Sequence, residues 1–318
     1  MNVHQLMYLE KQRQQSAGII REFWHFVLHL RWHYQLFILS GGYLLGGVLS
    51  PDLDFTWFGI QFLNVHLLLF GGATAYNSFW DNDEGPIGGL QNPPEMSPWM
   101  WMASLMLQMI GVLLAIPEGT YFLTVYIFSM LFFWLYSTPW ARWKSRPLKS
   151  LIAIGISTGF NSVLLGYLAA GNTTVPLLVF VAALGVSLLL LSLYPISQIY
   201  QQDEDTRRGD QTFAIQYGVQ GVRRFYVAGY FGGLLLISTV LITLHSWLGL
   251  IFGIIGVVTG VIVLRKLNKL TAQKGDYYSV MWIKYSTSLA FVGFLICALF
   301  LKHSGIQQVA QIAEILLQ

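Results

Sequence analysis

Long apolar runs alternate with short polar segments along the whole chain. Nine of these runs reach the roughly 20 residues that an α-helix needs to cross about 30 Å of hydrocarbon. They cover residues 29–50, 58–80, 97–116, 119–138, 149–170, 174–201, 222–244, 247–267 and 280–302. The pattern therefore predicts an all-α, polytopic membrane protein with nine transmembrane helices.

The two ends of the chain are predicted to lie outside these helices. Residues 1–28 begin with a polar stretch that predicts an amphipathic cytoplasmic segment at the membrane surface, without the apolar core of a cleavable signal. The tail, residues 304–318, has apolar side chains at helical spacing and predicts a second surface helix. No segment has the composition of a soluble domain, so we expect one membrane domain over residues 1–318.

Composition supports this class and excludes others. Hydrophobic residues make up 55% of the 318 positions and charged residues only 10%, whereas a soluble domain carries about 25% charged residues. The single cysteine, Cys297, excludes a disulfide framework and a cysteine-based metal site. A net charge of +3 is too small to indicate nucleic-acid binding, so we expect membrane lipids and no nucleic acid as partners.

The basic residues predict the orientation in the membrane. Fifteen of the 18 Lys and Arg residues belong to one set of connections. This set comprises residues 1–28, 81–96, 139–148, 202–221 and 268–279 with their immediate flanks. Arg31 and Lys284 lie a little way into spans from this same side, and Lys302 lies on the other side. By the positive-inside rule the N-terminus is cytoplasmic, and we expect a multi-pass protein of a membrane such as the bacterial inner (cytoplasmic) membrane.

Two acidic stretches lie at the cytoplasmic ends of predicted spans. Asn77 and Asp81 are four residues apart at the end of the second span, and Gln201 and Asp205 repeat this spacing at the end of the sixth. Such pairs stack on one helix face. Polar groups in a membrane are costly and tend to be functional, and Mg²⁺ prefers oxygen ligands, including substrate phosphate oxygens. We therefore predict a Mg²⁺ site that shares a polyanionic ligand.

This hypothesis assigns roles to particular residues. The predicted metal ligands are Asn77, Asp81, Asp83, Gln201, Asp203 and Asp205, of which Asp81 and Asp205 are the predicted catalytic residues. Glu204 is expected to face away from the site. In the alternative interpretation these acids are ordinary charges of a cytoplasmic loop that pair with Arg207 and Arg208.

A basic loop follows the fourth predicted span, on the same side as the acidic stretches. It carries Arg142, Lys144 and Arg146 within five residues. A diphosphate requires cations as well as a metal, so Lys144, Arg146 and Arg208 are candidates for binding it. Charge that only fixes the membrane orientation is the competing explanation.

His25, His29 and His33 also recur every four residues, at the start of the first predicted span. Without a neighbouring carboxylate they are typical of interfacial anchors rather than of a metal site.

At these motifs the chain resembles the UbiA-type intramembrane prenyltransferases. Asn77 and Asp81 match the first two positions of that family's Asn-x-x-x-Asp-x-x-x-Asp motif after helix two. Asp205 matches the last position of its Asp-x-x-x-Asp motif after helix six. The loop from Tyr136 to Pro147 is similar to the family's Tyr-Ser-x-Pro…Lys-x-Arg-Pro loop.

The resemblance implies a helical bundle around a central cavity. It also implies Mg²⁺-dependent transfer of an isoprenoid chain from a prenyl diphosphate to a lipophilic, usually aromatic, acceptor, and it adds Tyr136 to the residues at the diphosphate. Gly85 and Gln201 stand where the motifs have aspartates, and nearby Asp83 and Asp203 are candidates to supply the missing carboxylates. The other possibility is that one metal is held less tightly. The chain is thus similar to a divergent branch, whose acceptor need not be a quinone precursor.

Two other functions are compatible with the pattern. A UbiA-like terpene cyclase would use the same metal site without an acceptor. A cation-coupled or lipid transporter would place its ionisable groups near the middle of the membrane, whereas these acids lie at one face, which favours catalysis. The sequence pattern carries no signal for an oligomeric state.

Overall fold

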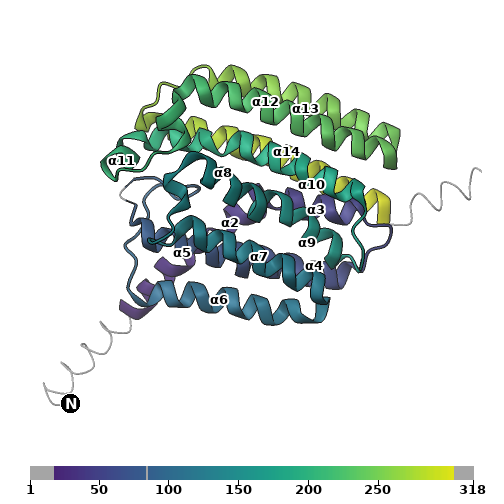
Figure 1. Ribbon diagram of the computed structural model, residues 1–318, viewed down its shortest axis with the longest axis horizontal. Coiled ribbons are helices and arrows are strands. Elements are labelled where there is room, and N and C mark those ends of the chain that lie inside the picture. Colours follow the sequence, from purple (N-terminus) through teal and green to yellow (C-terminus); the bar gives the residue numbers. More distant parts are fainter. Residues whose placement is uncertain (1–17, 84, 304–318) are drawn as a thin grey trace, which may run out of the picture.

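The computed structural model describes residues 18–83 and 85–303, which form one elongated bundle of helices (Figure 1). In this part of the chain the only β-type pairing is an isolated bridge between Ile87 and Leu90. Three parts of the sequence prediction lie outside the described residues: residues 1–17 of the predicted N-terminal segment, Glu84 in the first acidic stretch, and the predicted tail 304–318.

Eight helices among the described residues are long and apolar enough to cross a membrane, and each overlaps one predicted span. They are Phe55–Asp81, Trp99–Glu118, Thr120–Ser137, Pro147–Ala169, Leu177–Arg207, Phe213–Leu244, Ser246–Leu267 and Lys274–His303. Their elements are α4 (Phe55–Leu63), η2 (Asn64–Phe70), α5 (Gly71–Asp81), α6 (Trp99–Ala115), η3 (Ile116–Glu118), α7 (Thr120–Ser137), α8 (Pro147–Ile154), η5 (Gly155–Phe160), α9 (Asn161–Ala169), α10 (Leu177–Leu193), η6 (Pro195–Gln201), α11 (Gln202–Arg207), α12 (Phe213–Leu244), α13 (Ser246–Leu267), η7 (Lys274–Asp276) and α14 (Tyr277–His303).

The first predicted span, residues 29–50, is broken rather than continuous. Residues 18–30 are helical, and Arg31 then adopts a left-handed conformation with φ 47°, which ends that helix. The chain continues as α2 (Trp32–Tyr34), η1 (Gln35–Leu39) and α3 (Gly41–Leu49). Among the described residues there are therefore eight long apolar helices and one segmented helix. The structure does not confirm the prediction of nine spanning helices.

Three helices contain a stretch of wider, π-helical turns, in η1, η2 and η5. Such a stretch rotates the side chains that follow it around the helix axis, and it often marks a functional site. η1 contributes Ile38 and Leu39 to the interior of the bundle, and η5 contributes Thr158. All three residues line the cavity described below.

Close helix packing depends on glycines at the crossing of α3 and α9. A Cβ atom added at Gly166 would overlap the backbone carbonyl of Tyr43, and one added at Gly46 would overlap the backbone of α9. Small residues let two membrane helices approach to backbone contact. The two helices are therefore held in direct contact beside the cavity.

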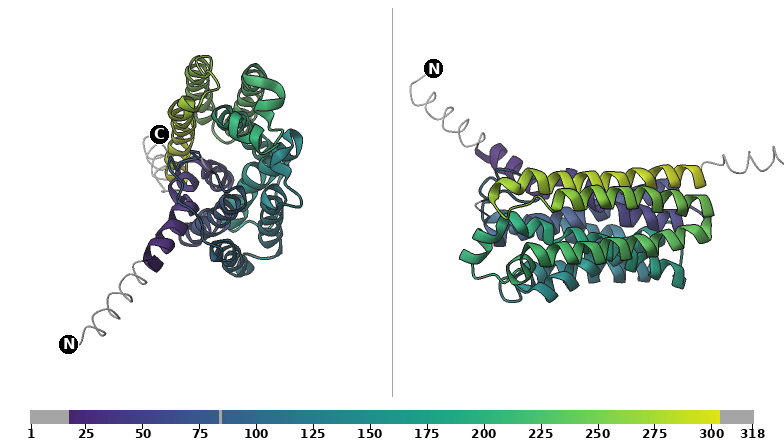
Figure 2. Two further views of the ribbon diagram at one scale, coloured as in Figure 1. Left: turned by 90° about the vertical axis from the view of Figure 1, so that its left-hand side faces the viewer. Right: turned by 90° about the horizontal axis from the view of Figure 1, so that it is seen from above.

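The polar segments gather at one end of the bundle. α11 and the helical residues 18–30 lie at the left in Figure 1, and the end of α14 lies at the right; the side view of Figure 2 shows the same arrangement. Helix 18–30 exposes Ile19, Ile20, Phe23 and Trp24, as a helix on a membrane surface would. This is the end that the basic residues predict to be cytoplasmic, and the orientation itself stays a prediction.

Replacement of Gly166 by alanine tests the packing of α3 against α9. The added methyl group meets backbone rather than a movable side chain, and overpacking of this kind costs about 1–3 kcal/mol. We expect Gly166→Ala to lower the thermal midpoint of the purified protein in detergent by several degrees. Gly293→Ala on α14 is the matched control, because a Cβ there meets no atom within 4 Å. Equal midpoints for the two variants would contradict this account of the helix contact.

Candidate active site

A cavity of about 250 Å³ lies at the polar end of the bundle, between the ends of α5, α7 and α10 and the segmented first helix. Eight of the ten predicted site residues line it: Asn77, Asp81, Asp83, Tyr136, Lys144, Gln201, Asp205 and Arg208. The two acidic stretches, far apart in sequence, therefore face one space.

The end of α5 presents the first set of oxygen atoms. Asn77 donates from Nδ2 to Asp81 Oδ2 at 2.9 Å and to Ser137 Oγ of α7 at 3.2 Å, which fixes the orientation of its amide. The helix ends after Asp81 because Asn82 adopts a left-handed conformation with φ 46°, which asparagine tolerates better than most residues. Asp83 then lies on the wall of the same cavity.

The second set comes from η6 and α11. α10 gives way to the tighter turns of η6 at Pro195, which has no N–H to continue the α-helical hydrogen bonds. After α11, Gly209 has φ 75°, and the N–H groups of Gly209 and Asp210 donate to Thr206 O at 3.1 Å and to Asp205 O at 2.9 Å. This pair of bonds is a Schellman motif, which reverses the chain direction just beyond the acids.

The loop between α7 and α8 is attached to this reversal. Arg142, with φ 39°, donates from Nε and Nη2 to the two carboxylate oxygens of Asp210, at 2.9 and 2.8 Å. These hydrogen bonds raise the pKa of the Arg142 guanidinium. The N–H of Gln211 also donates to Ser145 O at 3.0 Å. The two attachments hold in place the segment that carries Lys144.

Ion pairs connect the three segments across the cavity. Lys144 of the loop pairs with Asp81 of α5. Arg208, after α11, has Nη1 at 2.8 Å from Asp83 Oδ1 and Nη2 at 2.6 Å from Glu204 Oε1. Burial lowers the pKa of Arg208, but the hydrogen bond and the charge of Asp83 outweigh burial and raise it overall. The acids of the first stretch are thus matched by cations from the other two segments.

The helical phase of α11 corrects the expectation for Asp203. Gln201, Asp205 and Arg208 are spaced by four and three positions, so they share one face, which lines the cavity. Asp203, two positions from either neighbour, lies on the opposite face and is exposed. Glu204 is not among the residues that line the cavity, and it is only 7% exposed and pairs with Arg208.

Arg146 is the second predicted site residue outside the cavity lining. It has an extended backbone, with φ −129° and ψ 121°, directly before Pro147, the first residue of α8. A residue before proline is biased toward this conformation. The Arg146 side chain is exposed, and Lys144 in η4 (Trp143–Ser145) supplies the cation that lines the cavity.

Further polar residues line the cavity and are absent from the predicted site, among them Arg31, Tyr34, Tyr200 and Lys284. Arg31 and Tyr34 belong to the segmented first helix, Tyr200 to η6 and Lys284 to α14. The sequence does contain a signal for two of them, because a charge within an apolar run of a membrane protein usually faces a cavity.

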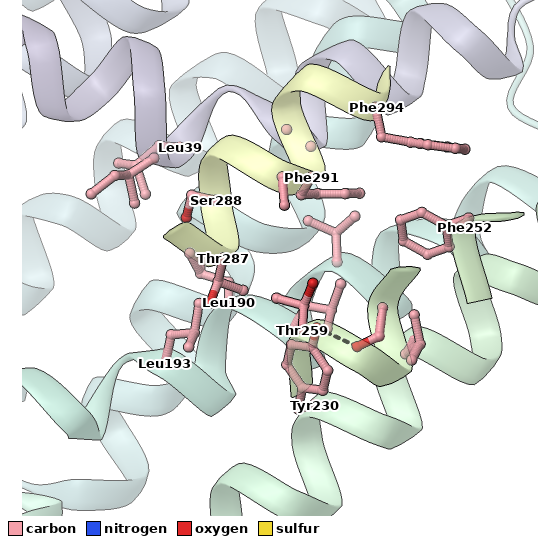
Figure 3. Close-up of a pocket in the computed structure, with 18 of the residues that line it drawn as sticks. Leu39, Leu190, Leu193, Tyr230, Phe252, Thr259, Thr287, Ser288, Phe291 and Phe294 are labelled. Carbon is pink, nitrogen blue, oxygen red and sulfur yellow. Dashed lines mark hydrogen bonds between the residues drawn. The ribbon is translucent and has the colours of Figure 1, made fainter. Parts of the chain in front are cut away.

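An apolar pocket of about 70 Å³ continues from the polar cavity along the bundle (Figure 3). The two spaces share the lining residues Ile38, Leu39, Thr158, Leu190, Leu193 and Ser288. In Figure 3 the leucines lie on one side of the pocket and the rings of Phe252, Phe291 and Phe294 lie on the other. A ligand could therefore place a polar group among the charges and an apolar chain among these side chains.

The predicted histidine anchors bind backbone carbonyls. Nε2 of His29 lies 2.8 Å from Pro94 O, and Nε2 of His33 lies 3.0 Å from Gly89 O. Both partners are in the loop after α5, so the histidines fasten helix 18–30 and α2 to the loop that follows the first acidic stretch.

The oxygen atoms of the cavity fit a hard divalent cation. Among the described residues, no group of three or more His, Cys, Asp or Glu side chains could hold a metal ion by itself. Mg²⁺, however, is usually held by one or two carboxylates together with water and substrate phosphate oxygens. Asp81 and Asp205, with the amides of Asn77 and Gln201, form such a donor set around one space. The residues therefore fit Mg²⁺ that binds together with a phosphate-bearing ligand.

Comparison with known proteins relates this arrangement to a family. The sequence model of the UbiA prenyltransferase family matches residues 36–283. A UbiA homolog from Archaeoglobus fulgidus bound to GPP and Mg²⁺ superposes with a TM-score of 0.67 at 13% identity, over 86% of this chain and 99% of that one. The same homolog bound to DMAPP and Mg²⁺ gives a TM-score of 0.65 at 14% identity, over 86% and 98% of the two chains.

A structure that addresses digeranylgeranylglyceryl phosphate synthase in membranes gives a TM-score of 0.59 at 17% identity, over 88% of this chain and 99% of that one. At these identities the structural matches show a common fold. A search of curated protein sequences finds no match. Because the family sequence model extends over most of the membrane region and the fold agrees with it, the chain belongs to the UbiA prenyltransferase family.

Proposed function

We propose that the protein is a Mg²⁺-dependent transferase that moves an isoprenoid chain from a prenyl diphosphate to a lipophilic, aromatic acceptor within the membrane. The observation that carries this proposal is the convergence of two acidic segments and two cations on one cavity that continues into an apolar pocket. Family membership supports it, as do the related structures bound to GPP or DMAPP with Mg²⁺.

The polar end of the cavity suits a diphosphate. Lys144 and Arg208 come from different segments and line the same space, so both can donate to phosphate oxygens. Their present partners, Asp81 and Asp83, are carboxylates of the kind that bind Mg²⁺. Mg²⁺, when bound, would neutralise negative charge on the departing pyrophosphate. Lys144 and Arg208 contribute to the same stabilisation from fixed positions, which requires no rearrangement during the reaction.

The apolar pocket suits the isoprenoid chain of the donor. Its walls are aliphatic and aromatic side chains from η1, α10, α13 and α14. A chain held there directs its diphosphate toward the charged end. The same walls exclude water from the carbon that loses the diphosphate, which favours attack by an acceptor over hydrolysis.

Replacement of the inward-facing acids tests the metal assignment. We expect Asp81→Asn and Asp205→Asn each to lower pyrophosphate release by at least about 100-fold, because each removes a charge that the proposed metal and diphosphate require. The assay uses the purified protein in detergent with geranyl, farnesyl or geranylgeranyl diphosphate, Mg²⁺ and a membrane-lipid extract.

Asp203→Asn is the matched control for these variants. It makes the same chemical change on an exposed face of α11, outside the cavity, so we expect nearly unchanged release. Near-normal release by both Asp81→Asn and Asp205→Asn would exclude the proposed metal site, and a large loss in Asp203→Asn would contradict the assignment of the inward face.

Removal of metal and of acceptor separates the remaining alternatives. EDTA should abolish release by the wild-type protein, and added Mg²⁺ should restore it. The cavity carboxylates and the diphosphate are both negatively charged, so the diphosphate needs a divalent cation to bind beside them. Release should also require the lipid extract. Full release in EDTA would refute the metal dependence. Mg²⁺-dependent release without the extract would identify a cyclase or a hydrolase in place of a transferase.

A further inference from the structure

A group of basic residues lies at the polar end of the bundle, outside both internal spaces. It forms where α12 continues after its kink at Gly218, where α13 ends and where η7 follows. Its members, named here the α12–α13 patch, are Arg223, Arg224, Arg265, Lys266, Lys269 and Lys274. None of the six lines the polar cavity or the apolar pocket, so the site described above does not use them.

Hydrogen bonds between α12 and α13 hold the two halves of the patch together. The two helices lie side by side along one edge of the bundle (Figure 1). The hydroxyls of Tyr226 and Tyr230 donate to Gly260 O at 3.1 Å and to Gly256 O at 2.9 Å. Nη2 of Arg223 donates to Asn268 O at 3.0 Å, just beyond the end of α13. The basic segments of both helices therefore form one surface.

The charge of this surface is not balanced by the protein. Residues 219–224 and 265–276 contain the six cations and a single acid, Asp276. Its Oδ2 accepts from the N–H groups of Thr271 at 2.8 Å and of Gln273 at 3.3 Å, so it serves the turn before α14. Among the described residues, none of the six cations takes part in an ion pair, whereas Lys144 and Arg208 at the cavity both do. Such a surface attracts a negatively charged partner.

The neighbouring side chains place the patch at the level of lipid headgroups. Nζ of Lys266 lies 4.0 Å from the centre of the Trp282 ring, and this ring is 43% exposed. Exposed tryptophan is enriched where a membrane meets water. Val258 and Ile262 are also exposed, and they precede Arg265 by seven and three positions, so all three share one face of α13. An apolar face that faces lipid chains thus ends at the patch.

We propose that the α12–α13 patch binds the phosphate headgroup of an anionic membrane phospholipid. Clusters of four to eight Lys and Arg residues beside membrane helices are suited to such headgroups. The chains of the lipid would lie along the exposed face of α13, which a free phosphate ion could not use. The bound headgroup would neutralise cations of α12, α13 and η7 together. This inference does not depend on the proposed function, because the patch lies outside the cavity.

Lipid titration tests the inference without an assay of turnover. Full-length protein in detergent is titrated with phosphatidylglycerol or phosphatidylcholine that carry identical acyl chains, one of them with a fluorescent label at its end. The first lipid is anionic and the second is neutral overall, so the pair isolates the charge of the headgroup. We expect the wild-type protein to bind phosphatidylglycerol about tenfold or more tightly, since each Lys or Arg near an anionic headgroup contributes several-fold. Inorganic phosphate at the same concentration should not displace it.

Two triple variants show whether the patch causes this preference. Arg224→Gln/Arg265→Gln/Lys269→Gln removes three exposed cations and keeps Arg223, which holds the end of α13. It should bind phosphatidylglycerol about tenfold more weakly, nearly as weakly as phosphatidylcholine. Arg224→Lys/Arg265→Lys/Lys269→Arg keeps the charge and should keep the preference. Because all three side chains are exposed, both variants should have a thermal midpoint close to that of the wild-type protein in detergent without lipid.

Arg21→Gln/Arg146→Gln/Arg207→Gln is the matched control. It removes the same charge from exposed side chains at the same end of the bundle but outside the patch, so the preference for phosphatidylglycerol should persist. Equal binding of the two lipids by the wild-type protein would overturn the inference. An equal loss in the control and in the patch variant would also overturn it, because the whole basic surface would then be responsible. Displacement of the lipid by inorganic phosphate would show a site for free anions instead.

Discussion

A charge inside a membrane protein must be balanced by a partner, and this constraint shapes the whole site. Asp81 and Asp83 extend from the end of α5 into a space largely shielded from water, where Lys144 and Arg208 oppose them. The two cations come from segments that are distant in sequence. Correct placement of the acids therefore requires the α7–α8 loop and the α11 segment to be in place, which couples the geometry of the site to the fold of the bundle.

Local backbone features make this convergence possible. Arg31, Asn82 and Arg142 each adopt a left-handed conformation, at a cost of about 1–3 kcal/mol for a residue other than glycine, and each stands where the chain turns beside the cavity. The Schellman motif at Gly209 and the two-point bond between Arg142 and Asp210 secure the turns around Asp205 and Lys144. The cost of these strained turns is offset by the hydrogen bonds and ion pairs that they allow.

Much of this could be predicted from the sequence, because apolar length and oxygen-rich motifs are local properties. Eight spans and the convergence of Asn77, Asp81 and Asp205 follow from them. The inward face of α11 could not, because its phase depends on the tight turns of η6, which leave Asp203 exposed and outside the cavity lining. The break at Arg31 and the position of Lys284 in the cavity wall were also missed, because a charge near the end of an apolar run can either set the membrane orientation or face a cavity, and the sequence signal was interpreted as orientation.

The central claim is that one cavity holds a divalent metal between the end of α5 and α11. Anomalous diffraction from crystals grown with Mn²⁺ in place of Mg²⁺, and with an unreactive thio analogue of a prenyl diphosphate, tests it most directly. The account predicts a metal peak at coordination distance from the carboxylates of Asp81 and Asp205, with the analogue's diphosphate between that metal and Lys144. An analogue bound in the cavity without a metal, or a metal bound only at Asp203 or elsewhere on the surface, would contradict it.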